Sequence, residues 1–121
     1  MKILTIWLAL VGFAFADVSK VDVAEAEKLM ADEIQILDVR TEEEWNDGHL
    51  DGAVRVDFLE KGFAEEVVKA VDPKKPLLVY CRSGGRSAKA SKLLDKLGFS
   101  EIKDLDGGII AWKKAGKKVV K

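Results

Sequence analysis

Short apolar segments alternate along this chain with stretches whose apolar residues recur at helical spacing, and this alternation limits the folds open to it. Strands are predicted at residues 34–37, 53–56, 77–80 and 102–105. Helices are predicted at residues 22–30, 41–48, 58–71, 87–97 and 109–115. Strands that alternate with helices favour a mainly parallel central sheet flanked by helices on both faces, which is an α/β fold.

Two of the predicted helices begin with a capping signal. Asp22 stands three residues before Glu25, and Thr41 stands three residues before Glu44. Asp and Thr side chains at such positions accept a hydrogen bond from the first helical turn, and a Glu three residues later can return one. We therefore expect helices to begin directly after Asp22 and Thr41.

Length and charge restrict the possible functions. A chain of 121 residues is typical of a single domain. The 20 basic and 21 acidic residues nearly balance, so the overall charge does not predict nucleic-acid binding. The lysines at residues 113–118 are expected to form a solvated face.

The first 16 residues differ in composition from the rest. Lys2 precedes an apolar segment, and Ala14-Phe15-Ala16 fits the pattern of a cleavage site. This combination predicts a secretory signal peptide over residues 1–16 and a mature domain over residues 17–121. The alternative is a membrane anchor, but the apolar run is shorter than the roughly 20 residues that span a bilayer. We expect an exported protein of a bacterial periplasm, without membrane contact after cleavage.

The single cysteine, Cys81, follows the apolar segment 77–80 and opens a glycine-containing turn that leads into a helix. One cysteine cannot form an intramolecular disulfide, so the alternatives are an intermolecular bridge, a buried inert thiol and a reactive thiol. Backbone N–H groups and a helix N-terminus in such a turn favour an anion, and Arg82 and Arg86 add positive charge. Because the thiolate is the nucleophilic form, we expect Cys81 to be reactive.

Few other residues offer acid–base or metal chemistry. His49 is the only histidine, and it follows a short predicted helix. A structural hydrogen-bonding role for His49 is favoured over that of a general base for Cys81. One Cys and one His cannot complete a four-ligand metal site, so no metal or cofactor is expected.

The spacing within the loop separates two kinds of chemistry. Phosphatases and arsenate reductases with a related loop place an arginine after five intervening residues, whereas Arg86 follows Cys81 after four. A loop that is one residue shorter makes a smaller cradle. Such a cradle fits a sulfur atom better than a tetrahedral phosphate.

Three parts of the sequence together resemble signatures of the rhodanese family. They are DVRTEEEW (38–45) followed by GHLDGA (48–53), VYCRSGGRSA (79–88) and LDGGIIAW (105–112). The resemblance extends over about residues 19 to 118, with the signatures in the family's order and spacing. It implies a single rhodanese-like domain.

The resemblance also implies a thiosulfate sulfurtransferase that works through a persulfide. The Cys81 thiolate would take the outer sulfur of thiosulfate or a similar donor. A thiophilic acceptor such as cyanide, a thiol or a partner protein's cysteine would then remove that sulfur. The implied loop that binds substrate and persulfide comprises Arg82, Ser83, Gly84, Gly85, Arg86 and Ser87. Supporting residues are expected at Asp38, Arg40, Glu44 and His49.

Several roles stay open from the sequence. Arg82 and Arg86 are candidates to bind an anionic donor, and the alternative for Arg86 is a brace for the loop. Trp45 and Trp112 are expected in the core. The alternative functions are a sulfur-relay or partner-binding module, a phosphatase or arsenate reductase, and an inactive domain. The short loop argues against the second, and the presence of Cys81 argues against the third.

Overall fold

A five-stranded sheet forms the centre of the fold in the computed structural model, which describes residues 17–121. The strands are β1 (Asp17–Val21), β2 (Gln35–Asp38), β3 (Ala53–Arg55), β4 (Leu77–Tyr80) and β5 (Glu101–Leu105). The helices are α2 (Val23–Ala31), α3 (Glu42–Asn46), α4 (Phe63–Ala70), α5 (Gly85–Lys96) and α6 (Gly108–Lys114). The strand order is β1-β5-β4-β2-β3, and every neighbouring pair is parallel. The predicted α/β fold is confirmed.

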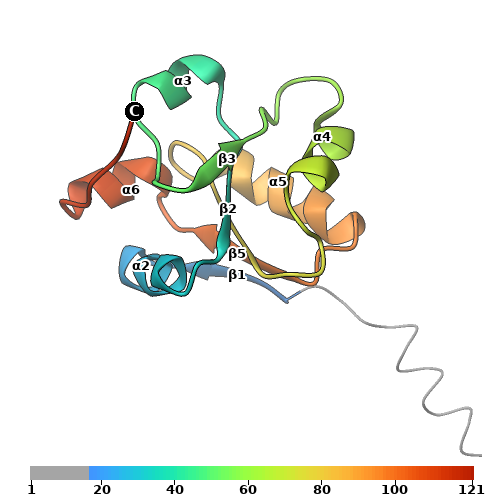
Figure 1. The fold of residues 1–121 in the computed structure, drawn as a ribbon, viewed down its shortest axis with the longest axis horizontal. Coiled ribbons are helices and arrows are strands. Elements are labelled where there is room, and N and C mark those ends of the chain that lie inside the picture. Colours follow the sequence, from blue (N-terminus) through green and yellow to red (C-terminus); the bar gives the residue numbers. More distant parts are fainter. Residues whose placement is uncertain (1–16) are drawn as a thin grey trace, which may run out of the picture.

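Helices cover both faces of this sheet. Figure 1 shows α4 and α5 on one side of the sheet and α2 and α6 on the other. Every residue of the central strand β4 is buried. Leu77 and Val79 belong to the core cluster that includes residues of α4 and α5. Leu78 and Tyr80 belong to the cluster that includes residues of α2 and α6. Because strand side chains alternate between faces, one continuous apolar run contributes to both cores.

Two elements differ from the sequence prediction. Strand β1 was not predicted, because it lies at the sheet edge beside β5 and only Val21 of its residues is buried. Such a strand lacks the apolar run by which buried strands are detected. The helix predicted from residue 58 begins at Phe63, since Gly62 has a φ of +84°, in the left-handed region where a helix cannot continue.

Both capping signals are confirmed. The backbone N–H of Glu25 donates to Asp22 Oδ1 at 2.9 Å. At the start of α3, Glu44 N–H donates to Thr41 Oγ1 at 3.2 Å, and Thr41 N–H donates to Glu44 Oε1 at 3.0 Å. The hydrogen bond from Thr41 N–H fixes the Glu44 side chain beside the first turn of α3.

The parallel topology brings the ends of β2 and β4 together. Asp38 and Tyr80 are the last residues of these strands, and they are paired in register. The segments that contain Arg40 and Cys81 follow directly. They therefore leave the sheet at the same edge, where parallel α/β folds bind their ligands.

The predicted signal peptide, residues 1–16, lies outside the described residues. Across residues 17–121, no helix combines the length and the apolar character needed to cross a bilayer.

Candidate active site

The Cys81 loop connects β4 to α5 and folds its backbone around the sulfur. Gly84 has a φ of +118°, which favours glycine, and it directly precedes α5. Two backbone N–H groups consequently donate to Cys81 Sγ, from Gly84 at 3.1 Å and from Ser87 at 3.4 Å. The Cys81 side chain is 1% exposed. The loop thus forms a cradle of N–H donors around a buried sulfur.

The surroundings of Cys81 favour its ionised form. Burial raises the pKa of the thiol, while the Ser87 hydroxyl and the N–H groups of Ser87, Gly84 and Ser83 lower it by hydrogen bonding. The net result is a pKa below the ordinary value of cysteine. Since the thiolate is the nucleophilic form of cysteine, these contacts favour a nucleophilic Cys81.

The hydroxyl of Ser87 lies beside the sulfur and is fully buried. Its Oγ is 3.5 Å from Cys81 Sγ, and it donates a hydrogen bond to the Gly84 carbonyl oxygen at 3.3 Å. A Cys81 thiol can donate to this oxygen, but a thiolate or persulfide needs the hydroxyl proton to point at sulfur. The direction of one O–H bond therefore affects how well the loop holds a sulfur anion.

The first turn of α6 fixes the other side of the loop. The N–H groups of Ile109 and Ile110 donate to the carbonyl oxygens of Cys81 and Arg82 at 3.0 and 3.1 Å. Gly108 makes this approach possible, because a Cβ there would lie 2.4 Å from the Arg82 carbonyl oxygen. The glycines of the LDGGIIAW signature thus position the loop that the second signature supplies.

Arg86 braces the loop against α3. Its Nη1 and Nη2 donate to Glu44 Oε1 and Oε2 at 2.7 and 2.8 Å, in a two-point ion pair. The hydrogen bond from Arg86 is the main reason why the pKa of Glu44 falls to about 2. Glu44 is held in turn by Thr41. Of the two roles that the sequence left open for Arg86, the geometry therefore matches the brace for the loop. The Arg86 guanidinium is already paired with a carboxylate.

Arg82 differs from Arg86 in both exposure and pairing. Its side chain is exposed, and it makes no ion pair with any residue in the 17–121 range. Only its backbone is fixed, by the contact with Ile110. Arg82 is therefore the guanidinium of the loop that is available to an incoming anion.

Asp38 and Arg40 form a buried ion pair at the same edge of the sheet. Arg40 Nη2 donates to Asp38 Oδ2 and to the Gly48 carbonyl oxygen, both at 2.8 Å. The Tyr80 hydroxyl donates to Asp38 Oδ2 at 2.6 Å and accepts from Leu50 N–H at 3.1 Å. Burial of the Tyr80 hydroxyl raises its pKa, so it stays a donor at neutral pH. This network braces the segments after β2, and none of its hydrogen bonds involves the Cys81 sulfur.

His49 has structural partners. Its ring stacks on Trp45 with centroids 3.4 Å apart, and its Nδ1 lies 3.1 Å from the Trp45 carbonyl oxygen. Its backbone pairs with Val120, which fixes the C-terminal segment near α3. Trp45 is half-buried, whereas Trp112 is buried in the core as expected.

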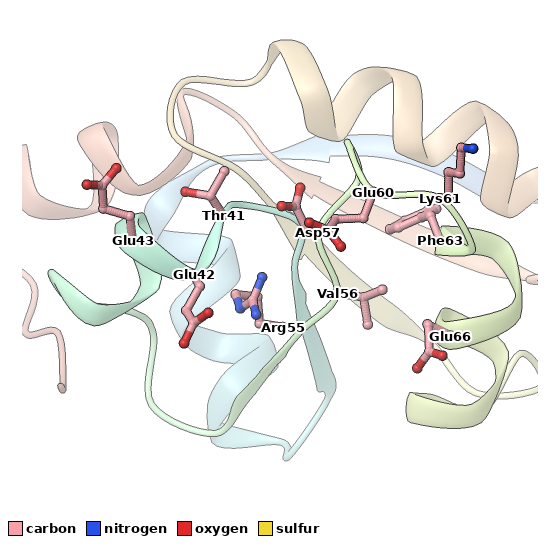
Figure 2. A pocket seen from close by; sticks show the side chains of 10 residues that line it. All are labelled: Thr41, Glu42, Glu43, Arg55, Val56, Asp57, Glu60, Lys61, Phe63 and Glu66. Carbon is pink, nitrogen blue, oxygen red and sulfur yellow. The ribbon is translucent and has the colours of Figure 1, made fainter.

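A polar pocket of about 680 Å³ lies beside the start of α3. Figure 2 shows the side chains that line it. Its walls come from the start of α3, from β3 and the segment after it, and from α4. Its lining residues are Thr41, Glu42, Glu43, Arg55, Val56, Asp57, Glu60, Lys61, Phe63 and Glu66. Carboxylates outnumber cations in this set, and Cys81 is not among the lining residues. The pocket is therefore a neighbour of the sulfur site rather than the site itself.

One polar residue near the loop was missed from the sequence. Asp104 in β5 is 3% exposed, and its Oδ1 has no hydrogen-bond partner in the described part of the chain. The sequence did offer a signal for it. Asp104 lies in the predicted strand 102–105 at a position that is expected to face the core, where an acidic residue is unusual. Among residues 17–121, no group of three or more His, Cys, Asp or Glu side chains could hold a metal ion.

Comparison with known proteins gives a consistent result. A family model described as a rhodanese-like domain matches residues 22–115. Thiosulfate sulfurtransferase 16, chloroplastic, of Arabidopsis thaliana is 38% identical over 107 residues, which cover 81% of this chain and 89% of that protein. A crystal structure of a rhodanese-related protein from Thermoplasma volcanium has 28% identity and a TM-score of 0.73, covering 84% of this chain and 97% of that one.

The same domain also occurs within larger proteins. The tRNA uridine(34) hydroxylase of Chlamydia trachomatis is 42% identical over 91 residues, and the match spans 71% of this chain but 28% of that protein. The family model covers most of residues 17–121 and includes all three signatures, and the plant sulfurtransferase is more than 30% identical over most of the chain. The chain therefore belongs to the rhodanese-like domain family.

Proposed function

We propose that this protein is an exported sulfurtransferase that moves a sulfane sulfur from thiosulfate or a similar donor to cyanide or a thiol. Membership of the family supports a sulfurtransferase-type enzyme with a cysteine nucleophile. The observation that carries the finer proposal is the convergence of the Gly84 and Ser87 N–H groups on Cys81 Sγ. These donors stabilise an anion on sulfur without a neighbouring base.

In the first step, the Cys81 thiolate attacks the outer sulfur of thiosulfate. A bond forms between Cys81 Sγ and that sulfur, and the bond between the outer sulfur and the sulfonate breaks. Sulfite leaves with the bonding electron pair, and Cys81 keeps a persulfide with one negative charge. The cradle that holds the thiolate can hold this charge, because it offers N–H groups and a hydroxyl rather than a fixed counter-ion.

In the second step, the acceptor attacks the outer sulfur of the persulfide. With cyanide, a carbon–sulfur bond forms, the sulfur–sulfur bond breaks, and thiocyanate leaves the regenerated Cys81 thiolate. A thiolate acceptor would leave as a persulfide by the same exchange. No proton or electron is gained or lost by the enzyme over the cycle with cyanide.

Arg82 is assigned to binding of the anionic donor. It is exposed, unpaired within the described residues, and next to Cys81 in sequence. Arg86 is assigned to bracing the loop instead, because its guanidinium is already paired with Glu44. A single free arginine favours a donor that carries negative charge on oxygen.

Steady-state assay of thiocyanate formation from thiosulfate and cyanide tests this function. The proposal predicts double-displacement kinetics, with parallel lines in reciprocal plots at several cyanide concentrations. A stable persulfide with negligible turnover would instead favour the sulfur-relay or partner-binding module. Absence of any sulfur transfer from thiosulfate would contradict the proposed donor.

Export is a separate part of the proposal, and it depends on the signal peptide predicted at residues 1–16. Expression of the full chain in a bacterium, followed by fractionation and N-terminal sequencing, tests it. The expected product begins at Asp17 and lies in the periplasm. A full-length cytoplasmic product would contradict export and leave the sulfur chemistry unaffected.

A further inference from the structure

The exposed face of α6 begins beside the Cys81 loop. The N–H of Ile110 donates to the Arg82 carbonyl oxygen at 3.1 Å, and a Cβ at Gly108 would lie 2.4 Å from the same oxygen. The backbone of the loop therefore lies against the first turn of α6. Figure 1 shows α6 at one side of the molecule, with no helix or strand beyond it. The outward side of α6 thus lies next to the residue that follows the nucleophile.

This outward side combines one apolar residue with two lysines. Ile110 is 41% exposed, and Lys113 and Lys114 follow it by three and four residues, which places all three on one face of the helix. Both lysines are exposed, and neither forms an ion pair within residues 17–121. Arg82 is likewise exposed and unpaired among these residues. The four residues Arg82, Ile110, Lys113 and Lys114 are called the α6 patch below.

The sequence around the α6 patch adds positive charge. Residues 107–121 contain five lysines and no acidic residue, and Asp106 is the nearest acid before them. Lys117 is paired with Glu27 at 2.9 Å, whereas the other lysines of this segment make no ion pair with any described residue. Since the formal net charge of the chain is −1, this excess of positive charge is local. Such a region attracts a negatively charged partner and repels a positive one.

The burial of the sulfur sets a requirement for the acceptor. Cys81 is 1% exposed and lies within a cradle of N–H donors. A small acceptor such as cyanide can enter this cradle alone, but the cysteine of another protein reacts efficiently only when that protein is held in front of it. The α6 patch adjoins the loop, so a protein bound there is held beside the persulfide. A lipid surface would meet the same charges but would bring no thiol.

We propose that the α6 patch docks an acidic protein surface that presents an acceptor cysteine to the Cys81 persulfide. Ile110 supplies an apolar contact among three cations, a composition that resembles a small interface with a charged rim. The proposal names the class of acceptor for the sulfur transfer proposed above, and it rests on formation of that persulfide.

The transfer step balances without a further reactant. The acceptor thiol first loses its proton to solvent, and its thiolate attacks the outer sulfur of the Cys81 persulfide. A bond forms between the acceptor sulfur and the outer sulfur, and the bond from the outer sulfur to Cys81 Sγ breaks. The electron pair of that bond stays on Cys81, and the acceptor leaves as a persulfide.

The first test compares two synthetic peptides as acceptors. Each has one cysteine between glycine spacers, and the ends of one peptide are glutamates where the other has serines. The Cys81 persulfide is formed with thiosulfate, excess donor is removed, and the gain of about 32 Da by each peptide is followed in time. At low salt the acidic peptide should react about ten-fold faster, and the advantage should largely disappear at about 0.5 M salt. Equal rates at low salt would overturn the proposal.

Charge-reversal variants locate the effect on the protein. Lys113→Glu combined with Lys114→Glu should abolish the advantage of the acidic peptide and leave the rate with the serine peptide unchanged. The matched control is Lys74→Glu with Lys75→Glu, which alters two exposed lysines before β4, at the sheet edge opposite Cys81. This control changes the net charge equally and should keep the advantage. An advantage that survives in the α6 variant, or that is lost equally in the control, would contradict docking at the α6 patch.

A binding measurement separates this inference from the sulfur chemistry. A fluorescent acidic peptide with serine in place of cysteine needs no persulfide, and its anisotropy should show several-fold weaker binding to the α6 variant than to the control. Failure of this peptide to bind the unaltered protein would overturn the docking surface even if sulfur transfer occurs. Binding without any persulfide formation would contradict the proposed function and leave the docking surface supported. Binding of phosphatidylglycerol vesicles, but not of the peptide, would make the patch a lipid contact and overturn the proposal.

Discussion

Two buried polar clusters lie at the same edge of the sheet, one after β2 and one after β4, and they differ in where their hydrogen bonds go. In the first cluster, Arg40 and Tyr80 donate to Asp38, and Arg40 also donates to a backbone carbonyl. In the second cluster, two backbone N–H groups donate to the single sulfur of Cys81, and the Ser87 hydroxyl lies beside it. The first cluster is closed, whereas the second holds an atom that can react.

Both clusters are buried and polar, but this difference gives them different roles. The first stabilises the fold, and the second holds a nucleophile. A charged pair that satisfies itself can stabilise loops, but it cannot stabilise a charge that appears during a reaction. Donors that converge on one nucleophile can do so, because their orientation is set before the substrate arrives. Burial and charge alone would not distinguish the two clusters; the direction of their donors does.

The sharpest contrast is expected from Cys81→Ser. Because the oxygen of serine is a far weaker nucleophile toward sulfur, sulfur transfer should fall at least about a thousand-fold. Stability should change by less than about 1 kcal/mol, since the side chains are similar in size. Thiocyanate assay and urea denaturation measure the two effects. Retained activity would remove Cys81 from the mechanism.

Arg40→Ala is expected to lower stability strongly while leaving the chemistry of Cys81 intact. Removal of this guanidinium leaves the Asp38 carboxylate buried without its partner, which should cost about 3–5 kcal/mol of unfolding free energy. Any molecules that remain folded should still form a persulfide. The double variant Asp38→Leu with Arg40→Met serves as a control, because it removes both charges and should recover much of the stability. A loss below about 1 kcal/mol for Arg40→Ala would contradict the closed network.

A smaller effect is expected when the two loop arginines are compared. Arg82→Gln should raise the KM for thiosulfate about ten-fold without a change in melting temperature, because Arg82 is exposed and unpaired within the described residues. Arg86→Gln is the matched variant, and it should lower the melting temperature through loss of the Glu44 pair. If Arg86→Gln raised the KM and Arg82→Gln lowered the melting temperature, Arg86 would be the donor-binding residue and Arg82 the brace.

The smallest effect is expected in acid. The pKa of Glu44 is lowered to about 2 in the folded protein, so its ion pair stabilises the fold above the ordinary pKa of Glu. That stabilisation is lost as the pH falls from about 4.5 toward about 2, and it amounts to on the order of 1 kcal/mol because the pair is partly exposed. Glu44→Gln should therefore flatten the acid limb of the stability curve. An unchanged limb would show that the brace contributes nothing to the fold.

Features formed by neighbouring residues could be predicted from the sequence, whereas contacts between residues far apart in the sequence could not. The apolar run at 77–80, the capping pairs and the Cys81 loop are each formed by residues close together in the sequence, so local patterns predicted them. The pair between Arg86 and Glu44 joins residues 42 positions apart and depends on how α3 and α5 pack. The place of Asp104 depends on the register between β4 and β5. Such contacts follow from the assembled sheet, which no local pattern contains.

The most direct test of the account is the intact mass of the protein after incubation with thiosulfate and then with cyanide. We expect the protein to gain about 32 Da, one sulfur atom, after thiosulfate and to lose it when cyanide is added, whereas Cys81→Ser should gain nothing. An unchanged mass, with the Cys81 thiol shown to be free by alkylation, would contradict sulfur transfer from thiosulfate through a Cys81 persulfide.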